Sequence, residues 1–307
     1  MDYQKILEEI SLEIKPLFGL GKVANYIPLL SKVNPNKFAM AITLLDGTQY
    51  KIGDSNEVFS IQSISKVFAF TLALESYGIK LYDRVGVEPS GDPFNSLIQL
   101  EYEKGIPRNP FINAGAIVIT DTLLKSFKDD KTTLNKLLEF IRDISDNKNI
   151  NYDSDIADSE MSFGYKNMAL ANLMKSFDNL YNEPIDVLKI YFKQCAISMN
   201  VKDLSRAMLY LVHNGSDPVT KKEFTSLRRI KRINSLMLTC GHYDASGEFA
   251  FHVGLPGKSG VGGGIVAVVP NILGISVYSP ELNSHGNSLI GTKALELFTT
   301  KTGLSIF

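Results

Sequence analysis

The sequence contains no tryptophan and only two cysteines among its 307 residues. Two cysteines are too few for a disulfide scaffold, and Cys195 and Cys240 both stand in apolar stretches, so we expect two buried free thiols. Charge of one sign is not in excess either, because 32 Lys and Arg residues are balanced by 33 Asp and Glu residues. The net charge of −1 therefore gives no electrostatic reason to expect a nucleic acid or an anionic membrane as a partner.

Long hydrophobic runs are also absent. The most apolar stretch, residues 265–278, is interrupted by Pro270 and Asn271 and is too short to cross a bilayer, so it predicts two strands joined by a turn. The first ten residues mix acidic and basic side chains and do not have the pattern of a signal peptide. We therefore expect a soluble cytoplasmic protein.

The four histidines provide no local metal motif, because none has metal-ligand spacing with another histidine, a cysteine or a carboxylate. His252 alternates with apolar residues, which favours a packed position in a strand. The sequence also lacks the G-x-S-x-G motif of the nucleophile elbow, although a Ser-His-Asp triad built from distant residues remains open.

Strands are predicted near both ends of the chain, with helices between them. The expected strands are residues 38–45, 48–52, 248–253, 265–269 and 272–278, and a turn at Asp46-Gly47 joins the first two. Apolar periodicity predicts helices over 2–18, 63–74, 114–127, 132–145, 165–178, 184–195, 201–213, 222–239 and 286–300. Residues 79–112, which are rich in glycine and proline, are expected to form a long ordered loop.

This order of elements predicts an α+β fold. The simplest arrangement is an antiparallel five-stranded sheet built from both ends of the chain, flanked by helices and carrying an all-helical insertion. Residues 1–60 and 241–307 would form the sheet region, and residues from about 61 to 240 would form the mainly helical region of a single domain.

The first motif that can carry chemistry is the S-x-x-K pair of Ser63 and Lys66. Residues i and i+3 share a helix face, and a serine that opens the helix lies near unpaired backbone N–H groups. A serine hydroxyl becomes a nucleophile when a base takes its proton, and a lysine can act as that base only if burial keeps it neutral. The alternative is an N-cap beside a solvated lysine. The same spacing recurs at Ser145 and Lys148, in a polar stretch expected to be a loop.

A second motif, Lys258-Ser259-Gly260, opens a glycine-rich stretch that ends at Gly264. Glycine lets the backbone approach a ligand closely, so a main-chain N–H group here could complete an oxyanion hole with that of Ser63. The alternative is a flexible hairpin loop. An early S-x-x-K together with a late K-[ST]-G is the pattern of penicillin-recognising serine enzymes, whose fold also has a helical insertion.

The whole chain resembles the serine-dependent glutaminases, which share the serine β-lactamase-like fold. The resemblance extends from about Gly21 to Leu297 and rests on several motifs in the same order. These motifs are residues 21–28 (GKVANYIP), 59–68 (FSIQSISKVF), 88–91 with Phe94 and Asn95, 109–117 (NPFINAGAI), 240–244 (CGHYD) and 249–264 (FAFHVGLPGKSGVGGG).

The resemblance implies hydrolysis of L-glutamine to L-glutamate and ammonia without a metal or organic cofactor. By motif, Ser63 would be the nucleophile, Lys66 its base, and Tyr243 a neighbour that helps to move protons. The N–H groups of Ser63 and Val261 would form the oxyanion hole. The residues expected to line the substrate pocket are Tyr26, Asn113, Glu160, Asn167 and Tyr191. The chain would act as one catalytic domain over 1–307, in a homo-oligomer that is a dimer or a tetramer.

The chemistry of these side chains fits a free amino acid. The carboxylate of Glu160 can pair with an ammonium group, and amide or phenol groups can donate to a carboxylate without adding charge. Residues 159–164 favour a turn between Glu160 and Asn167.

Two other functions remain open at the level of sequence. A β-lactamase or penicillin-binding-type hydrolase would use the same serine and lysine, but it would normally carry an export signal. A non-catalytic glutamine-binding protein would share the fold, but the intact Ser63, Lys66 and Tyr243 argue against it.

Overall fold

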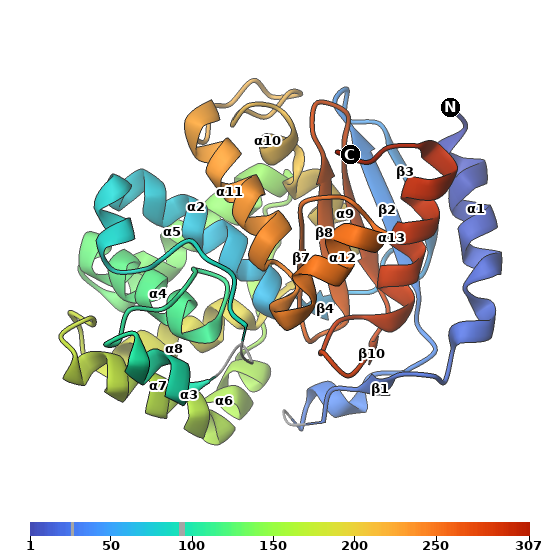
Figure 1. Ribbon diagram of the computed structural model, residues 1–307. Coiled ribbons are helices and arrows are strands. Elements are labelled where there is room, and N and C mark those ends of the chain that lie inside the picture. The colour runs from blue at the N-terminus through green and yellow to red at the C-terminus, as the bar shows by residue number, and fades with distance from the viewer. Residues whose placement is uncertain (26–27, 92–95) are drawn as a thin grey trace.

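A five-stranded antiparallel sheet with the strand order β3-β2-β9-β8-β7 forms one half of the computed structural model (Figure 1). The structure describes residues 1–25, 28–91 and 96–307. The strands are β2 (Ala39–Leu44), β3 (Gln49–Gly53), β7 (Gly257–Ser259), β8 (Gly264–Val269) and β9 (Leu273–Tyr278). Because β2 pairs with β9, with Ala39 opposite Tyr278, segments from both ends of the chain form one sheet. The predicted α+β class and the five-stranded antiparallel sheet are confirmed.

One of the five predicted strands is wrong. Residues 248–253 lie largely in helix α12 (Ser246–His252), and the fifth strand is β7, within the stretch expected to be a glycine-rich bend. In α12, Phe249 is buried and Phe251 is 86% exposed, whereas a strand would point both side chains to the same face. His252 is likewise exposed rather than packed in a strand.

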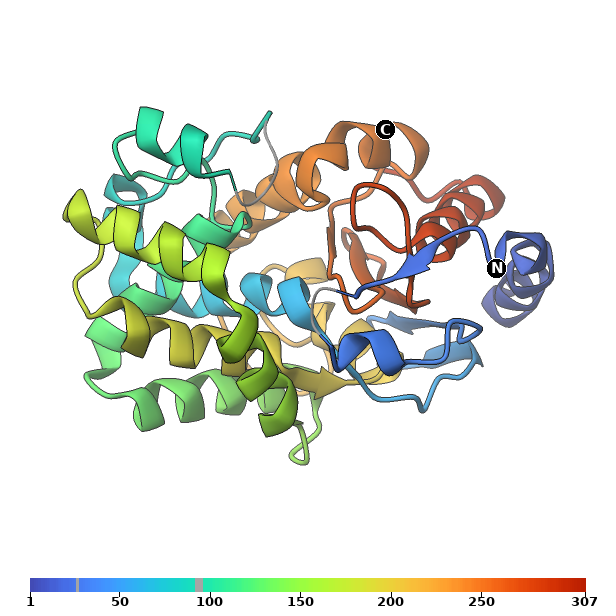
Figure 2. The same ribbon diagram turned by 90° about the horizontal axis from the view of Figure 1, so that it is seen from below.

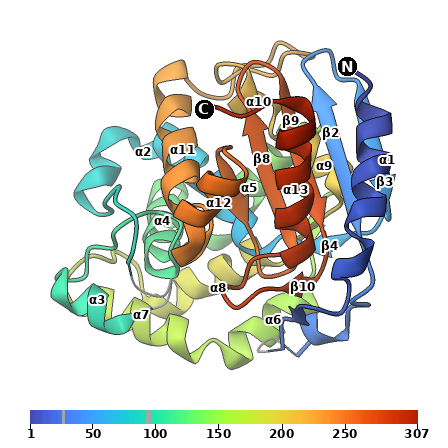
Figure 3. The same ribbon diagram turned by 45° about the vertical axis from the view of Figure 1, so that its right-hand side comes forward.

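Helices cover both faces of the sheet. Helices α1 (Tyr3–Glu13) and α13 (Leu289–Thr302) lie over one face (Figure 3), where Leu7, Ile10 and Phe298 pack on the sheet. Helices α9 (Val201–Ala207) and α10 (Leu209–Val212) pack against the opposite face. Since both faces are covered, β8 and β9 are buried along their whole length, which explains their continuous apolar sequences.

The helical region lies beside the sheet, as Figures 1 and 2 show from two directions. Its central helix is α2 (Ser65–Tyr77), which packs against α4 (Asn113–Phe127) and is almost fully buried. The other helices of this region are α3 (Leu97–Tyr102), α5 (Asp130–Ser145), α6 (Ser154–Phe163), α7 (Tyr165–Ser176), α8 (Pro184–Cys195) and α11 (Leu227–Cys240). Helices α3 and α6 were not predicted. The predicted turn over residues 159–164 is wrong for most of its length, because residues 159–163 complete α6, and the chain breaks only at Gly164, which separates α6 from α7.

Short strands and 3-10 turns complete the fold. Strand β4 (Phe59–Ser60) pairs with β6 (Ile197–Met199), which also pairs with β5 (Asn151–Tyr152). Strand β1 (Lys22–Val23) pairs with β10 (Glu281–Leu282). The 3-10 turns are η1 (Lys15–Leu17), η2 (Leu30–Lys32), η3 (Gln62–Ile64), η4 (Gly78–Asp83) and η5 (Tyr243–Ala245). The β4–β6 pairing fixes the segment just before Ser63 against the end of α8.

Among the described residues, no helix has the length and apolar character needed to cross a membrane. The same residues contain no group of three or more His, Cys, Asp or Glu side chains arranged to hold a metal ion. Cys195 and Cys240 are buried free thiols, as predicted.

Candidate active site

Ser63 lies in η3, directly before α2, at the junction of the sheet and the helical region. The prediction that Ser63 opens the helix is close, because α2 begins at Ser65. The preceding residue, Gln62, has a φ of +48°, in the left-handed region that non-glycine residues adopt only at a cost of about 1–2 kcal/mol. This backbone turn directs the chain from β4 into the helix, and Ser63 remains slightly accessible, with an exposure of 8%.

Lys66 lies one helical turn after Ser63 and is buried. Its Nζ donates to the carbonyl oxygen of Phe111 at 3.1 Å and to Oδ1 of Asn113 at 2.7 Å. Burial lowers the pKa of the Lys66 amine to about 8, although the nearby Cys195 and Glu160 oppose this shift. A neutral amine has two N–H groups and a lone pair, so these two acceptors leave the lone pair free to accept a proton.

The glycine-rich loop packs directly on the turn that carries Ser63. A Cβ atom added to Gly260 would lie 2.6 Å from the carbonyl oxygen of Ile61, and one added to Gly262 would overlap the carbonyl oxygen of Ser60. Glycine is therefore required at both positions for the two segments to approach each other. The approach places Val261 on the wall of the same cavity as Ser63.

Tyr243 also lies beside the turn that carries Ser63. Its phenol lies beside Ser63, Ser259 and the backbone of Val261, while burial raises its pKa to about 12. Lys258 is also buried, and its Nζ lies 4.6 Å from the centre of the Tyr243 ring. Burial, and next the charge of Lys66, hold the pKa of the Lys258 amine well below its usual value. Because its pKa is about 12, the Tyr243 phenol is neutral near pH 7 and can both donate and accept a proton.

A cavity of about 430 Å³ opens above these groups. It is lined by seven of the residues expected from the sequence, namely Ser63, Asn113, Glu160, Asn167, Tyr191, Tyr243 and Val261. Lys66 does not line the cavity, but it is hydrogen-bonded to Asn113 in the wall. Tyr26, the remaining expected residue, lies outside the described residues. The structure thus brings together side chains from α4, α6, α7, α8 and the turn that carries Ser63.

The two asparagines of the cavity are oriented by Lys66. Because Oδ1 of Asn113 accepts from the lysine, its Nδ2 faces the other way and donates to Oδ1 of Asn167 at 3.0 Å. Each amide has one acceptor end and one donor end, so this contact leaves the N–H groups of Asn167 available to a ligand. A carboxylate is the complementary group.

Glu160 is the only acidic side chain that lines the cavity among the described residues. It is buried, and burial raises its pKa to about 7, against the opposing effects of a hydrogen bond from Gln62 and the charge of Lys66. The bond from Gln62 Nε2 to Glu160 Oε1 is 2.7 Å long. An ammonium group entering the cavity would find its counter-ion here.

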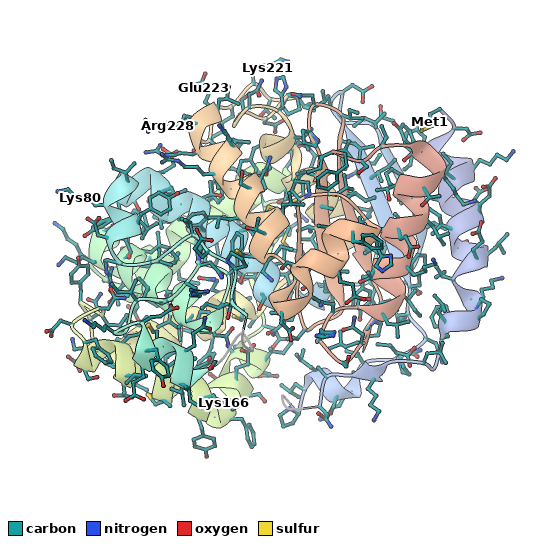
Figure 4. The ribbon with its side chains drawn as sticks, in the orientation of Figure 1. Met1, Lys80, Lys166, Lys221, Glu223 and Arg228 are labelled. Atoms are coloured by element: carbon teal, nitrogen blue, oxygen red, sulfur yellow. The ribbon has the colours of Figure 1, made fainter. Side chains whose placement is uncertain are left out.

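Several lining residues were not predicted as site residues. These are Gln62, Phe163, Gly164, Tyr165, Lys166, Phe192 and Cys195. Figure 4 places Lys166 at the lower edge of the helical region, near α6 and α7. Gln62 lies in the motif of residues 59–68, directly before Ser63, but no spacing pattern in the sequence indicates that it is a site residue. The second S-x-x-K pair does not form a site, since Ser145 donates to Ile141 within α5 and Lys148 pairs with Asp143.

Known proteins resemble this chain over its whole length. The glutaminase family profile matches residues 21–307. A glutaminase from Aliarcobacter butzleri is 61% identical over 307 residues, covering 100% of both chains, and one from Rhizobium leguminosarum bv. trifolii is 54% identical, covering 100% of this chain and 99% of the relative. A probable glutaminase from Bacillus subtilis, solved in complex with 6-diazo-5-oxo-L-norleucine, is 34% identical, with a TM-score of 0.91 over 100% of this chain and 98% of that chain.

The arrangement of the sheet and the helical region is therefore that of the serine β-lactamase-like fold found in solved glutaminases. Within that fold, the chain belongs to the glutaminase family and is an enzyme of the amidohydrolase class.

Proposed function

We propose that the protein hydrolyses L-glutamine to L-glutamate and ammonia through a glutamyl ester on Ser63. The observation that carries this proposal is the junction of a buried amine, a partly accessible serine and a polar cavity with one carboxyl group. The similarity to named glutaminases supports the substrate, as does a related structure in complex with 6-diazo-5-oxo-L-norleucine, a glutamine analogue.

In the first step, neutral Lys66 takes the proton of the Ser63 hydroxyl, and Ser63 Oγ attacks the carboxamide carbon of glutamine. The lowered pKa of Lys66 supports this role, since a fraction of the amine is neutral near pH 7. The oxyanion would accept hydrogen bonds from the N–H groups of Ser63 and Val261, and loss of one such donor typically costs about 2.7–4 kcal/mol of transition-state stabilisation.

In the second step, the C–N bond breaks and the leaving nitrogen takes up a proton, so that ammonia departs. Tyr243 is suited to relay this proton because its phenol is neutral and lies beside Ser63. Water then attacks the glutamyl ester with Lys66 as the base, which releases glutamate and restores Ser63.

Substrate recognition would use a carboxylate for the ammonium group of glutamine and neutral donors for its carboxylate. Glu160 would accept hydrogen bonds from the α-ammonium group of glutamine. Asn167, held by Asn113, would donate to the α-carboxylate, together with Tyr191, whose phenol stays protonated because burial raises its pKa well above the usual value. Tyr26 is proposed as a further contact on the basis of the family motif alone.

Two assays test the proposal: ammonia release from glutamine and from asparagine, and the opening of a chromogenic β-lactam. We expect release from glutamine and no β-lactam opening. A β-lactamase would give the reverse, and a binding protein would give neither reaction.

Residues 1–307 are proposed to act as one catalytic domain in a cytoplasmic homo-oligomer, a dimer or a tetramer. Light scattering of the purified protein tests the oligomeric state, and a monomer in solution would contradict the homo-oligomer. Fractionation of cells tests the location, and enzyme recovered outside the cytoplasmic fraction would contradict the cytoplasmic assignment.

A further inference from the structure

A chain of three hydrogen bonds runs from the backbone of α8 to the carboxyl group of Glu160. Ser60 Oγ donates to the carbonyl oxygen of Cys195 at 2.9 Å. Gln62 Nε2 donates both to Ser60 Oγ at 2.9 Å and to Glu160 Oε1 at 2.7 Å. Ser60, Gln62 and Glu160 are all buried, so water does not compete strongly with these bonds.

The direction of this chain is determined at its backbone end. Cys195 is the last residue of α8, so its carbonyl group has no N–H partner in a following helical turn and needs another donor. A carbonyl oxygen can only accept, so the single hydrogen of the Ser60 hydroxyl is committed to it. Ser60 Oγ can then only accept from Gln62, which turns the NH₂ end of the Gln62 amide toward Ser60 and Glu160. The reversed amide would place two acceptors against each other.

The backbone also holds Gln62 in place for this contact. Pairing of β4 with β6 sets Ser60 opposite Ser198, beside the end of α8, and the positive φ of Gln62 follows two residues later. A left-handed non-glycine residue is retained only where the surrounding structure compensates its cost, and the double hydrogen bond of the Gln62 side chain is such a compensation.

We propose that Gln62 is a positioning residue for substrate recognition, which presents Glu160 as a charged acceptor to the α-ammonium group of glutamine through a hydrogen-bond chain anchored on the Cys195 carbonyl. The proposal rests on the proposed function, because it assumes that glutamine binds with its ammonium group at Glu160. Gln62 acts through Glu160 and takes no part in the bond-breaking steps.

The other groups around Glu160 do not replace Gln62 in this role. The titratable or charged side chains that line or adjoin the same cavity are Lys66 from α2, Tyr165 and Lys166 from α7, Tyr191 and Cys195 from α8, and Tyr243 from η5. Tyr165 and Lys166 are exposed, so solvent screens the charge of Lys166. Burial raises the pKa values of Tyr191, Cys195 and Tyr243, so these three groups are neutral near pH 7 and add no charge. Lys66 favours the charged carboxylate only while it is itself protonated, and the proposed mechanism needs it neutral. The amide of Gln62 is a donor at every pH.

Loss of the Gln62 donor should therefore act through the charge state of Glu160. Burial raises the pKa of Glu160 to about 7 even though the hydrogen bond from Gln62 and the charge of Lys66 work against that shift. Without this bond the pKa of Glu160 rises further, so the carboxyl group is more often protonated near pH 7. The defect should shrink as the pH increases, because the carboxyl group then ionises without help.

The test compares the wild-type enzyme with Gln62→Met, which keeps the length of the side chain and removes both donors. We expect KM for glutamine to rise about fivefold near pH 7, with a smaller change in kcat. The ratio of mutant to wild-type KM should fall between about pH 6 and about pH 8.5, and the acidic limb of kcat/KM should move up by about one unit. The preference for glutamine over 4-carbamoylbutyrate, which lacks the amino group, should decrease.

Gln194→Met is the matched control. Gln194, in α8, has a buried amide side chain as Gln62 does, but its hydrogen bonds are with Ser65 and Thr120. Its loss should therefore leave the pH dependence of KM and the preference for the amino group unchanged. If Gln62→Met does not fold, Ser60→Ala removes the anchor and should shift the same two readouts in the same direction.

A KM defect of constant size across the pH range, with unchanged preference for the amino group, would overturn the role of Gln62 while leaving the proposed function intact. Wild-type enzyme that releases no ammonia from glutamine would overturn both. A shift of both readouts that is confined to the Gln62 and Ser60 variants supports the proposal.

Discussion

The amine of Lys66 is held 2.7 Å from the side-chain oxygen of Asn113, and its other acceptor, the carbonyl group of Phe111, is also uncharged. Neither bond supplies the full counter-charge that would offset burial of an ammonium group. This relationship explains why the amine is available as a base, and it also fixes the orientation of Asn113 and so of Asn167.

Replacement of Lys66 by methionine should abolish turnover and stabilise the fold. Burial lowers the pKa of Lys66 from 10.5 to about 8, which at neutral pH corresponds to a destabilisation of about 3 kcal/mol. Loss of the two hydrogen bonds offsets about 2 kcal/mol of this gain, so we expect a net stabilisation of about 1 kcal/mol. Thermal unfolding at neutral pH measures it.

The sign of the effect depends on pH. Because the folded-state pKa of Lys66 is depressed, the wild type gains stability as the pH rises through the interval from about 8 to 10.5, and the advantage of Lys66→Met should shrink there. If the stability of Lys66→Met relative to the wild type grew with pH instead, the pKa of Lys66 would not be lowered by burial.

Ser63→Ala should abolish ammonia release and leave the unfolding temperature nearly unchanged, because loss of a small hydroxyl beside a helix start costs only about 1 kcal/mol. The chain offers a matched control in Ser145→Ala, which removes a serine with the same S-x-x-K spacing and a buried hydrogen bond to Ile141. Equal loss of turnover in both variants would contradict the assignment of Ser63.

Activity should rise with pH across the neutral range. Glu160 must be charged to bind the ammonium group and has a pKa of about 7, while Lys66 must be neutral and has a pKa of about 8. Both groups lose protons as the pH increases, so kcat/KM should climb between about pH 6 and about pH 9. A profile that falls over this interval would rule out a neutral lysine as the base.

Tyr243→Phe should lower kcat by about 100-fold or more with little change in KM, since loss of a proton-transfer group typically costs this much. The aromatic ring near Lys258 is kept, so the fold should be unaffected. Steady-state kinetics separate the two constants. A change confined to KM would mean that the phenol binds the substrate and does not move protons.

Gly262→Ala should damage the oxyanion site. The added methyl group would overlap the carbonyl oxygen of Ser60 and push Val261 away from the turn that carries Ser63, so we expect kcat to fall by about 100-fold. Gly247→Ala is the control, because its methyl group would meet no atom within 4 Å. Circular dichroism of both variants checks that the fold is retained.

Short sequence patterns predicted the turns, helices and strands that depend mainly on neighbouring residues. The Asp46-Gly47 turn between β2 and β3 was predicted because glycine accepts a positive φ. Gly47 has a φ of +87° and closes a three-residue loop, in which its N–H group donates to the carbonyl oxygen of Leu44. Residues 248–253 were misassigned because the buried Phe249 and Val253 stand four residues apart, a spacing that places both on one face of a helix as well as of a strand. Helix α6 was missed because its buried side chains are few and face α8.

The cavity is a product of tertiary packing, so spacing alone could not predict it. Asn113, Glu160, Asn167 and Tyr191 come from four different helices, and only the resemblance to a known family grouped them. The glycine at the break between α6 and α7 is also explained by tertiary packing, since a side chain at Gly164 would collide with the Phe192 ring of α8.

The central claim is a covalent glutamyl ester on Ser63, and acid quenching during turnover followed by peptide mass spectrometry tests it most directly. We expect a γ-glutamyl group on the peptide that contains Ser63, and none in Ser63→Ala. Steady ammonia release from glutamine with no modified peptide at any quench time, and retained release in Ser63→Ala, would contradict the account.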